Sequence, residues 1–402
     1  MVSNLIHNSF VTHHNEKNAA TYTLFTVKKR VLALTLASLT ALGYGLAQQN
    51  SSAFKTTQVL SGLEFPWGMA WLPTGEMLIT ERPGRLRIVR NNKLESAPII
   101  GVPSVFNSGQ GGLLDVAVHP DFAKNKLVYL SYAHGTDRAN RTRVARGVLN
   151  GSNLTDVRVV FEVTQAKSGG QHFGSRLQFL PDNTLLISTG DGGNPPASID
   201  GGLSRLQAQN LKSRLGKISR INDDGTIPKD NPYVGKSDAD SVLFSIGHRN
   251  IQGMTYDPVT KRIWATEHGS KGGDEVNLIE KGENFGWPLA TYSNEYFGPP
   301  VSPNKTLPGM LDAKFLWTPS VAPSGLAIYN GDKYPNWKGN LFSGALAGTA
   351  IHRLEVGAAG KITKEQIMDM PMRIRDVRTT PDGLIYFLTD EQNGRLMRLE
   401  PQ

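Results

Sequence analysis

The residues best able to do chemistry lie in glycine-rich segments. His172 follows Gly169-Gly170-Gln171, and Asp191 lies in a Gly190-Asp191-Gly192-Gly193 segment after the next predicted strand. An imidazole near its working pKa accepts a proton at neutral pH, and a carboxylate can orient it. Glycines on either side let a ligand approach the backbone closely. His172 is therefore a candidate general base with Asp191 as its partner, the alternative being a loop histidine without a catalytic role.

Several arginines indicate an anionic ligand. Arg249 directly precedes Asn250, so a guanidinium and an amide lie next to each other in the sequence. Together they suit the binding of a carboxylate or an oxyanion. Arg373 and Arg375 alternate along a predicted strand, so their side chains point to the same face. Two adjacent guanidinium groups repel each other unless an anion lies between them. The alternatives are a structural turn pair at Arg249 and two solvated edge charges at Arg373 and Arg375.

A third cluster has the composition of a hard-cation site. Glu267, Asp274 and Glu275 alternate with glycines, and oxygen ligands with bare carbonyls favour Ca²⁺ over zinc, although the spacing does not fit an EF-hand. The chain contains no cysteine, which excludes disulfides, thiolate zinc sites, iron–sulfur clusters and cysteine nucleophiles. Walker, dinucleotide-binding, zincin and nucleophile-elbow motifs are also missing from the sequence. Nucleotide and nicotinamide chemistry are therefore unsupported. A serine hydrolase is unsupported as well, although the absence of a motif does not exclude it.

The elements that must position these residues come from a loose internal repeat. Each copy has alternating apolar residues, a turn that usually contains proline, and a second apolar strand, which is typical of an antiparallel hairpin. Six copies cover residues 68–80, 114–130, 177–187, 253–265, 325–343 and 377–388. Their average spacing suits the blades of a propeller.

The sequence therefore predicts an all-β fold, a six-bladed β-propeller of four-stranded antiparallel blades, over residues 54–402 as a single domain. A final strand at 394–399 would close the ring by pairing with the N-terminal segment, and a short helix is expected at 203–211. The 42 glycines and 23 prolines among 402 residues agree with a turn-rich chain, and 39% hydrophobic with 19% charged residues indicates a packed globule. A β-sandwich or a solenoid is the alternative.

The N-terminus has the features of an export signal. Lys28-Lys29-Arg30 precedes an apolar run over 31–46, with small residues at 45 and 47, as in a secretory signal peptide over 28–47. Residues 1–27 are expected to be dispensable or to come from an overlong reading frame, and an uncleaved anchor is the alternative for the apolar run. We expect a bacterial periplasmic or secreted protein with no stable membrane association after cleavage. The net charge of +8 falls to +5 without residues 1–47, which argues against a nucleic-acid partner.

These clusters, in this order, resemble the soluble quinoprotein glucose and aldose sugar dehydrogenases, the glucose/sorbosone dehydrogenase family. The resemblance runs from Phe65-Pro66-Trp67-Gly68 to Asp390. It is most specific at 247–253, at 274–288 and at Ala322-Pro323-Ser324-Gly325. It implies a six-bladed propeller that binds pyrroloquinoline quinone (PQQ) and Ca²⁺, in agreement with the hairpins counted independently.

The resemblance also implies roles for individual residues. His172 would take the proton from the anomeric hydroxyl of an aldose, Asp191 would hold its imidazole, and Arg249 would stabilise the oxygen that becomes anionic. The quinone would be contacted by Gln110, His172, Arg249, Asn250, Ser320, Arg373 and Arg375. One Ca²⁺ would be held by backbone oxygens of Gly269 and Ser270, and a second, structural Ca²⁺ by Glu275 and the carbonyl of Phe285.

Two departures from the family pattern refine the expectation. Ala347 stands where the glucose dehydrogenases place a quinone-binding lysine, and the loops are shorter than in the dimeric enzymes. Both features resemble the aldose sugar dehydrogenase branch, which implies a broad sugar range and a monomer. The implied reaction is hydride transfer from sugar C1 to PQQ, giving an aldonolactone, with electrons passed on to an external soluble acceptor. The alternatives are a propeller lactonase and a non-catalytic propeller that binds sugar or protein.

Overall fold

The structure is a computed structural model that describes residues 54–401 except 194–196, 200 and 381. The expected N-terminal extension and signal peptide lie outside the described residues. The described residues belong to one compact unit. No helix among the described residues is long and apolar enough to cross a membrane.

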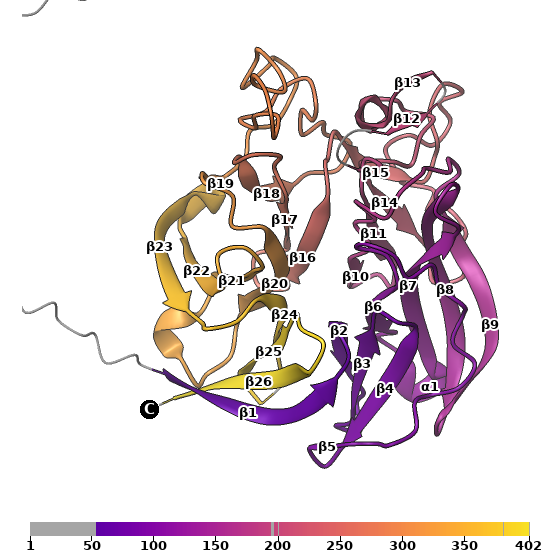
Figure 1. Ribbon diagram of the computed structural model, residues 1–402, viewed down its shortest axis with the longest axis vertical. Helices are drawn as coiled ribbons and strands as arrows, with labels where there is room; N and C mark the ends of the chain where they lie inside the picture. The colour runs from indigo at the N-terminus through magenta and orange to yellow at the C-terminus, as the bar shows by residue number, and fades with distance from the viewer. Residues whose placement is uncertain (1–53, 194–196, 200, 381, 402) are drawn as a thin grey trace, which may run out of the picture. The chain divides into compact units, whose positions relative to one another are not determined.

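The described chain forms six four-stranded antiparallel sheets, which are the six blades of a β-propeller (Figure 1). The first three blades consist, from the inner to the outer strand, of β2 (Pro66–Trp71), β3 (Met77–Glu81), β4 (Arg85–Arg90) and β5 (Lys93–Leu94); β6 (Leu113–Val118), β7 (Leu127–Gly135), β8 (Asn140–Asn150) and β9 (Asn153–Glu162); and β10 (Leu177–Phe179), β11 (Leu185–Thr189), β14 (Lys217–Ile221) and β15 (Leu243–Ile246).

The last three blades are built in the same way. They consist of β16 (Ile251–Asp257), β17 (Arg262–Glu267), β18 (Asp274–Ile279) and β19 (Phe315–Trp317); β20 (Pro323–Tyr329), β21 (Asn340–Ala345), β22 (Ala350–Val356) and β23 (Ile362–Asp369); and β24 (Ile374–Thr379), β25 (Ile385–Thr389), β26 (Gly394–Pro401) and β1 (Phe54–Leu63). The predicted six-bladed propeller is therefore confirmed, and each predicted hairpin supplies the two inner strands of one blade.

The ring closes through its two ends. The strand β26, predicted from residues 394–399, pairs antiparallel with β1, with Phe54 opposite Pro401 and Leu63 opposite Gly394. Figure 1 shows β1 in indigo alongside β26 in yellow. The N-terminal strand thus supplies the outer strand of the last blade, so the two ends of the described chain are joined within one sheet.

The hydrophobic core is divided among the contacts between neighbouring blades. One cluster joins Leu78 of blade 1 to Val128 of blade 2, and five similar clusters join blades 2 and 3, 3 and 4, 4 and 5, 5 and 6, and 6 and 1. The alternating apolar residues of the strands supply these contacts, since successive side chains point to opposite faces of each blade. Burial between blades therefore holds the ring together without any disulfide.

A buried charge cluster links the inner strands at the centre. Asp115 on β6 and Asp376 on β24 both accept from Arg176, at 3.2 and 3.0 Å, and both also pair with Arg378 at 3.0 Å. Gly325 on β20 lies so close that an added Cβ would come within 2.3 Å of Asp376 Oδ1. Two carboxylates and two guanidinium groups thus balance each other where side chains from three blades meet.

The remaining elements are short. They are α1 (Phe122–Asn125), the strands β12 (Ser198–Ile199) and β13 (Gly202–Leu203), and the 3₁₀ helices η1 (Ser204–Ala208), η2 (Pro335–Trp337) and η3 (Ala358–Gly360). The helix expected at 203–211 is the single 3₁₀ segment η1, which follows β13 in the loop before β14.

Candidate functional site

The residues expected to form the site lie in the segments that lead into the inner strands. Each blade of the ring begins with its inner strand at the same end, so these segments converge there. They carry Gln110 before β6, His172 before β10, Arg249 and Asn250 before β16, Ser320 before β20, and Arg373 and Arg375 at the start of β24.

His172 and Asp191 form a buried pair. His172 Nδ1 lies 2.7 Å from Asp191 Oδ1, and only 4% and 1% of their surfaces are exposed. His172 has a φ of 51°, a left-handed conformation that costs energy in a residue with a side chain. Gln110 stabilises this conformation of His172. Gln110 Oε1 accepts from the His172 N–H at 2.9 Å, and the backbone N–H of Gln110 donates to the Gly170 carbonyl at 2.6 Å.

Asp191 is held by three further contacts. Its Oδ2 accepts from Trp287 Nε1 at 2.9 Å, its Oδ1 accepts from the Gly193 N–H at 3.1 Å, and its N–H donates to the Arg249 carbonyl at 2.9 Å. Burial alone would raise the pKa of Asp191, but the interactions with His172 and Arg249 lower it overall. The carboxylate is therefore ionised and fixed in orientation.

The electrostatic surroundings keep His172 neutral. Burial and the nearby Arg249 lower the pKa of His172, against the opposing effect of Asp191. A neutral imidazole that donates from Nδ1 to an ionised carboxylate carries its lone pair on Nε2. No hydrogen bond to Nε2 is formed within the described part of the chain. The pair therefore has the arrangement of a general base.

Arg249 and Asn250 present donors without protein partners. Arg249 Nη1 donates to the His268 carbonyl at 3.1 Å, and its guanidinium lies 5.3 Å from the Trp287 ring centre, with no carboxylate of the described residues within ion-pair distance. Asn250 Oδ1 accepts from the Gly174 N–H at 3.0 Å, whereas its buried Nδ2 has no partner. Buried donors are normally satisfied, so these groups fit a ligand that accepts hydrogen bonds.

Arg373 and Arg375 share one carboxylate of the chain itself. Asp390 Oδ2 lies 3.1 Å from Arg373 Nη2 and 3.2 Å from Arg375 Nη2. Arg375 is buried and also donates to Gln252 Oε1 at 2.9 Å, while half of the Arg373 side chain is exposed. The alternative of two solvated edge charges is therefore wrong for Arg375, which is buried. Within the chain, the carboxylate that lies between the two arginines is Asp390.

Ser320 and Gly269 meet at another carboxylate. Asp274 Oδ2 accepts from Ser320 Oγ at 2.6 Å, and Asp274 Oδ1 accepts from the Gly269 N–H at 2.7 Å. Ser270 donates its N–H to Ser293 Oγ at 3.1 Å, and its own buried Oγ has no partner. The structure thus brings Ser320 and the predicted ligands Gly269 and Ser270 into one region, with an unsatisfied oxygen beside them.

Glu275 and Phe285, the predicted ligands of the second Ca²⁺, line one small pocket together with Asp312. Burial, followed by the neighbouring Glu267, raises the pKa of Glu275 to about 8. A carboxylate in such surroundings holds a proton unless a cation balances it. No three His, Cys, Asp or Glu side chains of the described residues converge on a metal position, so a cation here would also need carbonyl oxygens. Oxygen donors of this kind fit Ca²⁺.

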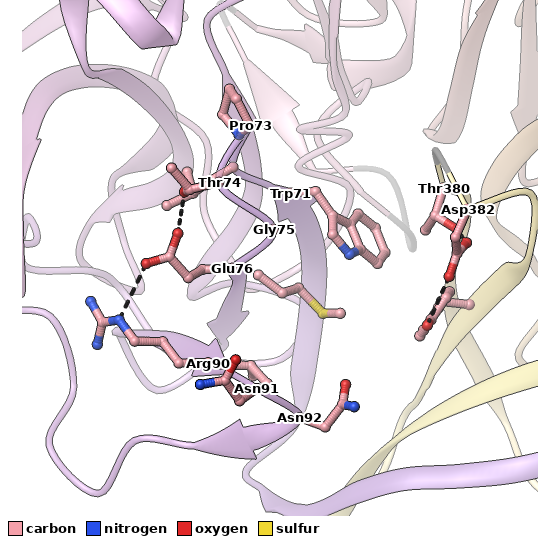
Figure 2. Close-up of a pocket in the computed structure, with 14 residues that line it drawn as sticks. Trp71, Pro73, Thr74, Gly75, Glu76, Arg90, Asn91, Asn92, Thr380 and Asp382 are labelled. Atoms are coloured by element: carbon pink, nitrogen blue, oxygen red, sulfur yellow. Dashed lines mark hydrogen bonds and ion pairs between the residues drawn. The ribbon is translucent and has the colours of Figure 1, made fainter.

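Two larger pockets lie at the opposite ends of the inner strands, by the hairpin turns. One of about 650 Å³ lies between blades 1 and 6, and Figure 2 shows Glu76 and Arg90 joined on one side of it and the Trp71 ring on the side of Thr380 and Asp382. Glu76 accepts from Thr74 and, at 3.4 Å, from Arg90. The other pocket, of about 870 Å³, contains Arg378. None of the predicted site residues lines either pocket.

Sequence reasoning missed several residues of the site. Trp287 lies in a segment noted for its resemblance, but nothing in its surroundings in the sequence predicts a bond to Asp191. Lys167 is buried, and its ammonium donates to Asn140 Oδ1 and the Gly169 carbonyl, both at 2.9 Å. Burial lowers the pKa of Lys167 to about 7. Asp390 and Arg82 were also missed; each directly follows a strand, β25 and β3 respectively.

Comparisons with known proteins agree with this architecture. The family described as Glucose / Sorbosone dehydrogenase matches residues 63–398. The chain is 42% identical to the aldose sugar dehydrogenase YliI of Escherichia coli over 85% of this chain and 91% of that protein. The crystal structure of the soluble aldose sugar dehydrogenase of Escherichia coli in its apo form superposes with a TM-score of 0.81 at 40% identity, over 87% of this chain and 100% of that one.

A more distant structure contains a cofactor. The PQQ-bound form of an aldose sugar dehydrogenase from Streptomyces coelicolor superposes with a TM-score of 0.70 at 27% identity, over 87% of this chain and 98% of that one. The fold and the matches define a propeller oxidoreductase of the sugar dehydrogenase type. The chain belongs to the glucose/sorbosone dehydrogenase family.

Proposed function

We propose that the protein is a PQQ- and Ca²⁺-dependent aldose dehydrogenase that oxidises the anomeric C1 hydroxyl of sugars to the aldonolactone. The observation that carries this proposal is the buried His172–Asp191 pair among arginines with too few carboxylate partners. A neutral base beside uncompensated positive charge suits a reaction that removes a proton near an anionic cofactor. The relatives named as aldose sugar dehydrogenases support the substrate class.

The residues present fit a flat, anionic quinone. Asn250 Nδ2 is an unpaired buried donor, and the guanidinium of Arg249 has no carboxylate partner among the described residues. With Gln110, Arg373 and Arg375 they supply amide and guanidinium groups for carboxylates and carbonyl oxygens. Ser320 is bonded to Asp274 and would contact the quinone from that position. When bound, PQQ supplies the acceptor for the hydride of sugar C1, and Ca²⁺ polarises that acceptor.

His172 performs the proton transfer. Its Nε2 takes the proton of the C1 hydroxyl as the C1–H bond breaks with its electron pair, so that the C1–O bond becomes the lactone carbonyl. Asp191, 2.7 Å from Nδ1, stabilises the imidazolium that forms. Trp287 and Gly193 keep the carboxylate in place, and Arg249 stabilises the oxygen that becomes anionic. A base in this position contributes about 10²–10⁴-fold to the rate.

The proposed cation ligands are backbone oxygens of Gly269 and Ser270 for one Ca²⁺, and Glu275 with the Phe285 carbonyl for the other. The unpaired Oγ of Ser270 and the high pKa of Glu275 support a positive charge at each place. We further propose a monomer, located in the periplasm or secreted, that passes electrons to an external soluble acceptor. The apolar segment at 31–46 supports this location.

Purified apoprotein tests the proposal. PQQ and Ca²⁺ are added, and dye reduction is followed with a panel of aldoses. We expect activity with several aldoses that needs both additions. Absence of activity together with absence of quinone uptake would contradict the proposal, and hydrolysis of a lactone without quinone would favour a lactonase instead.

A further inference from the structure

Arg82 is an arginine without a carboxylate partner at the same end of the ring as the candidate site. It follows β3 in blade 1, and its Nη1 donates to the Gly109 carbonyl at 2.6 Å. Its guanidinium lies 4.8 Å from the centre of the Phe65 ring, and its buried Nε has no hydrogen-bond partner. Among the described residues no carboxylate lies within ion-pair distance of it, whereas Arg85 and Arg87 of the same blade both pair with Glu81.

Arg82 lies next to site residues on two sides. Gly109, whose carbonyl it contacts, precedes Gln110, which holds the backbone of His172. On the other side, the positive charge of Arg82 acts on both Arg375 and Asp390. Arg82 therefore lies between the loop that supports the base and the arginine pair of blade 6.

The charges of this region do not balance within the chain. Arg373 and Arg375 share Asp390, while Arg82 and Arg249 have no carboxylate partner in the described part of the chain. Four guanidinium groups, against Asp390 and the buried Asp191 beside Arg249, thus leave an excess of positive charge in this region. Ala347 adds no positive charge; it is exposed and follows Leu346, whose carbonyl accepts a hydrogen bond from Arg373. Like charges held together in this way are destabilising until an anion joins them.

We propose that Arg82 is a further cofactor-binding residue, the fourth guanidinium that neutralises the three carboxylates of PQQ. The inference rests on the proposed function. Blade 1 would then help to hold the quinone directly, through a charge-assisted hydrogen bond from Arg82 Nε, which has no partner in the described part of the chain. This role of Arg82 also explains how the site supplies excess positive charge with alanine at position 347.

Titration of the Ca²⁺-loaded protein with PQQ, followed by tryptophan fluorescence and by calorimetry, tests this role without measuring turnover. We expect Arg82→Met to weaken PQQ binding by at least about tenfold, the usual effect of losing a charge-assisted bond. The plot of log Kd against log salt should also become shallower. Arg82→Lys should retain part of the affinity. Arg90→Met, in the same blade but paired with Glu76, is the matched control and should bind as the wild type does.

A second variant separates charge from loop support. Because Ala347 is exposed near Arg373, Ala347→Lys in the Arg82→Met background restores one positive charge without restoring the bond to Gly109. Recovery of affinity supports the proposal. Affinity of Arg82→Met equal to wild type overturns it and leaves the proposed function intact. Loss in Arg82→Met without recovery in the double variant assigns Arg82 to loop support and also overturns it. A wild-type protein that does not bind PQQ overturns both the inference and the proposed function.

Discussion

Arg375 Nη1 donates to Gln252 Oε1 at 2.9 Å, which joins β24 of blade 6 to β16 of blade 4. Gln252 follows Arg249 by three residues and Asn250 by two, and Asn250 Oδ1 accepts from the Gly174 N–H in the His172 loop. The arginine pair, the Arg249–Asn250 segment and the candidate base are therefore connected through two side-chain contacts. This linkage is the structural basis for treating them as one site.

Removal of the base should stop turnover and leave the cofactor in place. In His172→Gln we expect kcat to fall by about 10²–10⁴-fold, because a positioned base contributes that much, while PQQ affinity changes little. Steady-state dye reduction and a PQQ titration measure the two effects. His134→Gln on β7 is the control and should keep wild-type kcat. An unchanged kcat in His172→Gln would refute the assigned role.

The pH dependence should respond in opposite directions to two neighbouring charges. His172 must be neutral to accept a proton, so kcat/KM falls as pH drops through its pKa. Asp191 raises this pKa and Arg249 lowers it. Asp191→Asn should therefore move the acidic limb of the profile to lower pH, and Arg249→Met should move it to higher pH, each by about 1 unit or more. Shifts in the same direction would show that another group titrates.

Removal of Ca²⁺ should destabilise the protein through Glu275. A ligand that binds only the folded state stabilises it by about 2.7 kcal/mol at one hundred times its Kd. We expect a chelator to lower Tm by a few degrees and added Ca²⁺ to restore it, with no Ca²⁺ response of comparable size in Glu275→Gln. Glu280→Gln, an exposed glutamate on the same chain segment, is the control. A full Ca²⁺ response of Tm in Glu275→Gln would place the structural cation elsewhere.

The buried charge cluster at the centre should be important for stability. Arg378→Met leaves Asp115 and Asp376, both fully buried, with Arg176 as their one remaining arginine partner among the described residues. Breaking a buried ion pair costs about 3–5 kcal/mol, and we expect the free energy of unfolding to fall by that amount in denaturant titrations. Arg398→Met, which removes a more exposed pair with Glu400, should lower the free energy of unfolding much less. Equal losses in the two variants would contradict this account.

The fold was predictable because period-2 alternation and turn residues repeat along the chain. All six hairpins and the closing strand follow from such local signals, since a propeller blade is built from neighbours in the sequence. The helix expected at 203–211 shortened to η1 because a surface loop supports only a single turn there.

The site was less predictable, because its contacts join segments far apart in the sequence. The glycine-flanked positions His172 and Asp191 could be recognised from their surroundings. Trp287, which donates to Asp191 from 96 residues away, could not. The partner of Arg373 and Arg375 could not be predicted either. Their anion within the chain is Asp390, which lies 17 and 15 residues further along the sequence.

A single-turnover experiment tests the central claim most directly, that His172 acts as a base within a quinone-binding ring of arginines. Protein loaded with PQQ and Ca²⁺ is mixed anaerobically with excess aldose and no external acceptor, and the lactone is measured by mass spectrometry. The account predicts one lactone per bound quinone in the wild type and almost none in His172→Gln on the same time scale. No lactone from the loaded wild type, or equal rates in the two proteins, would contradict it.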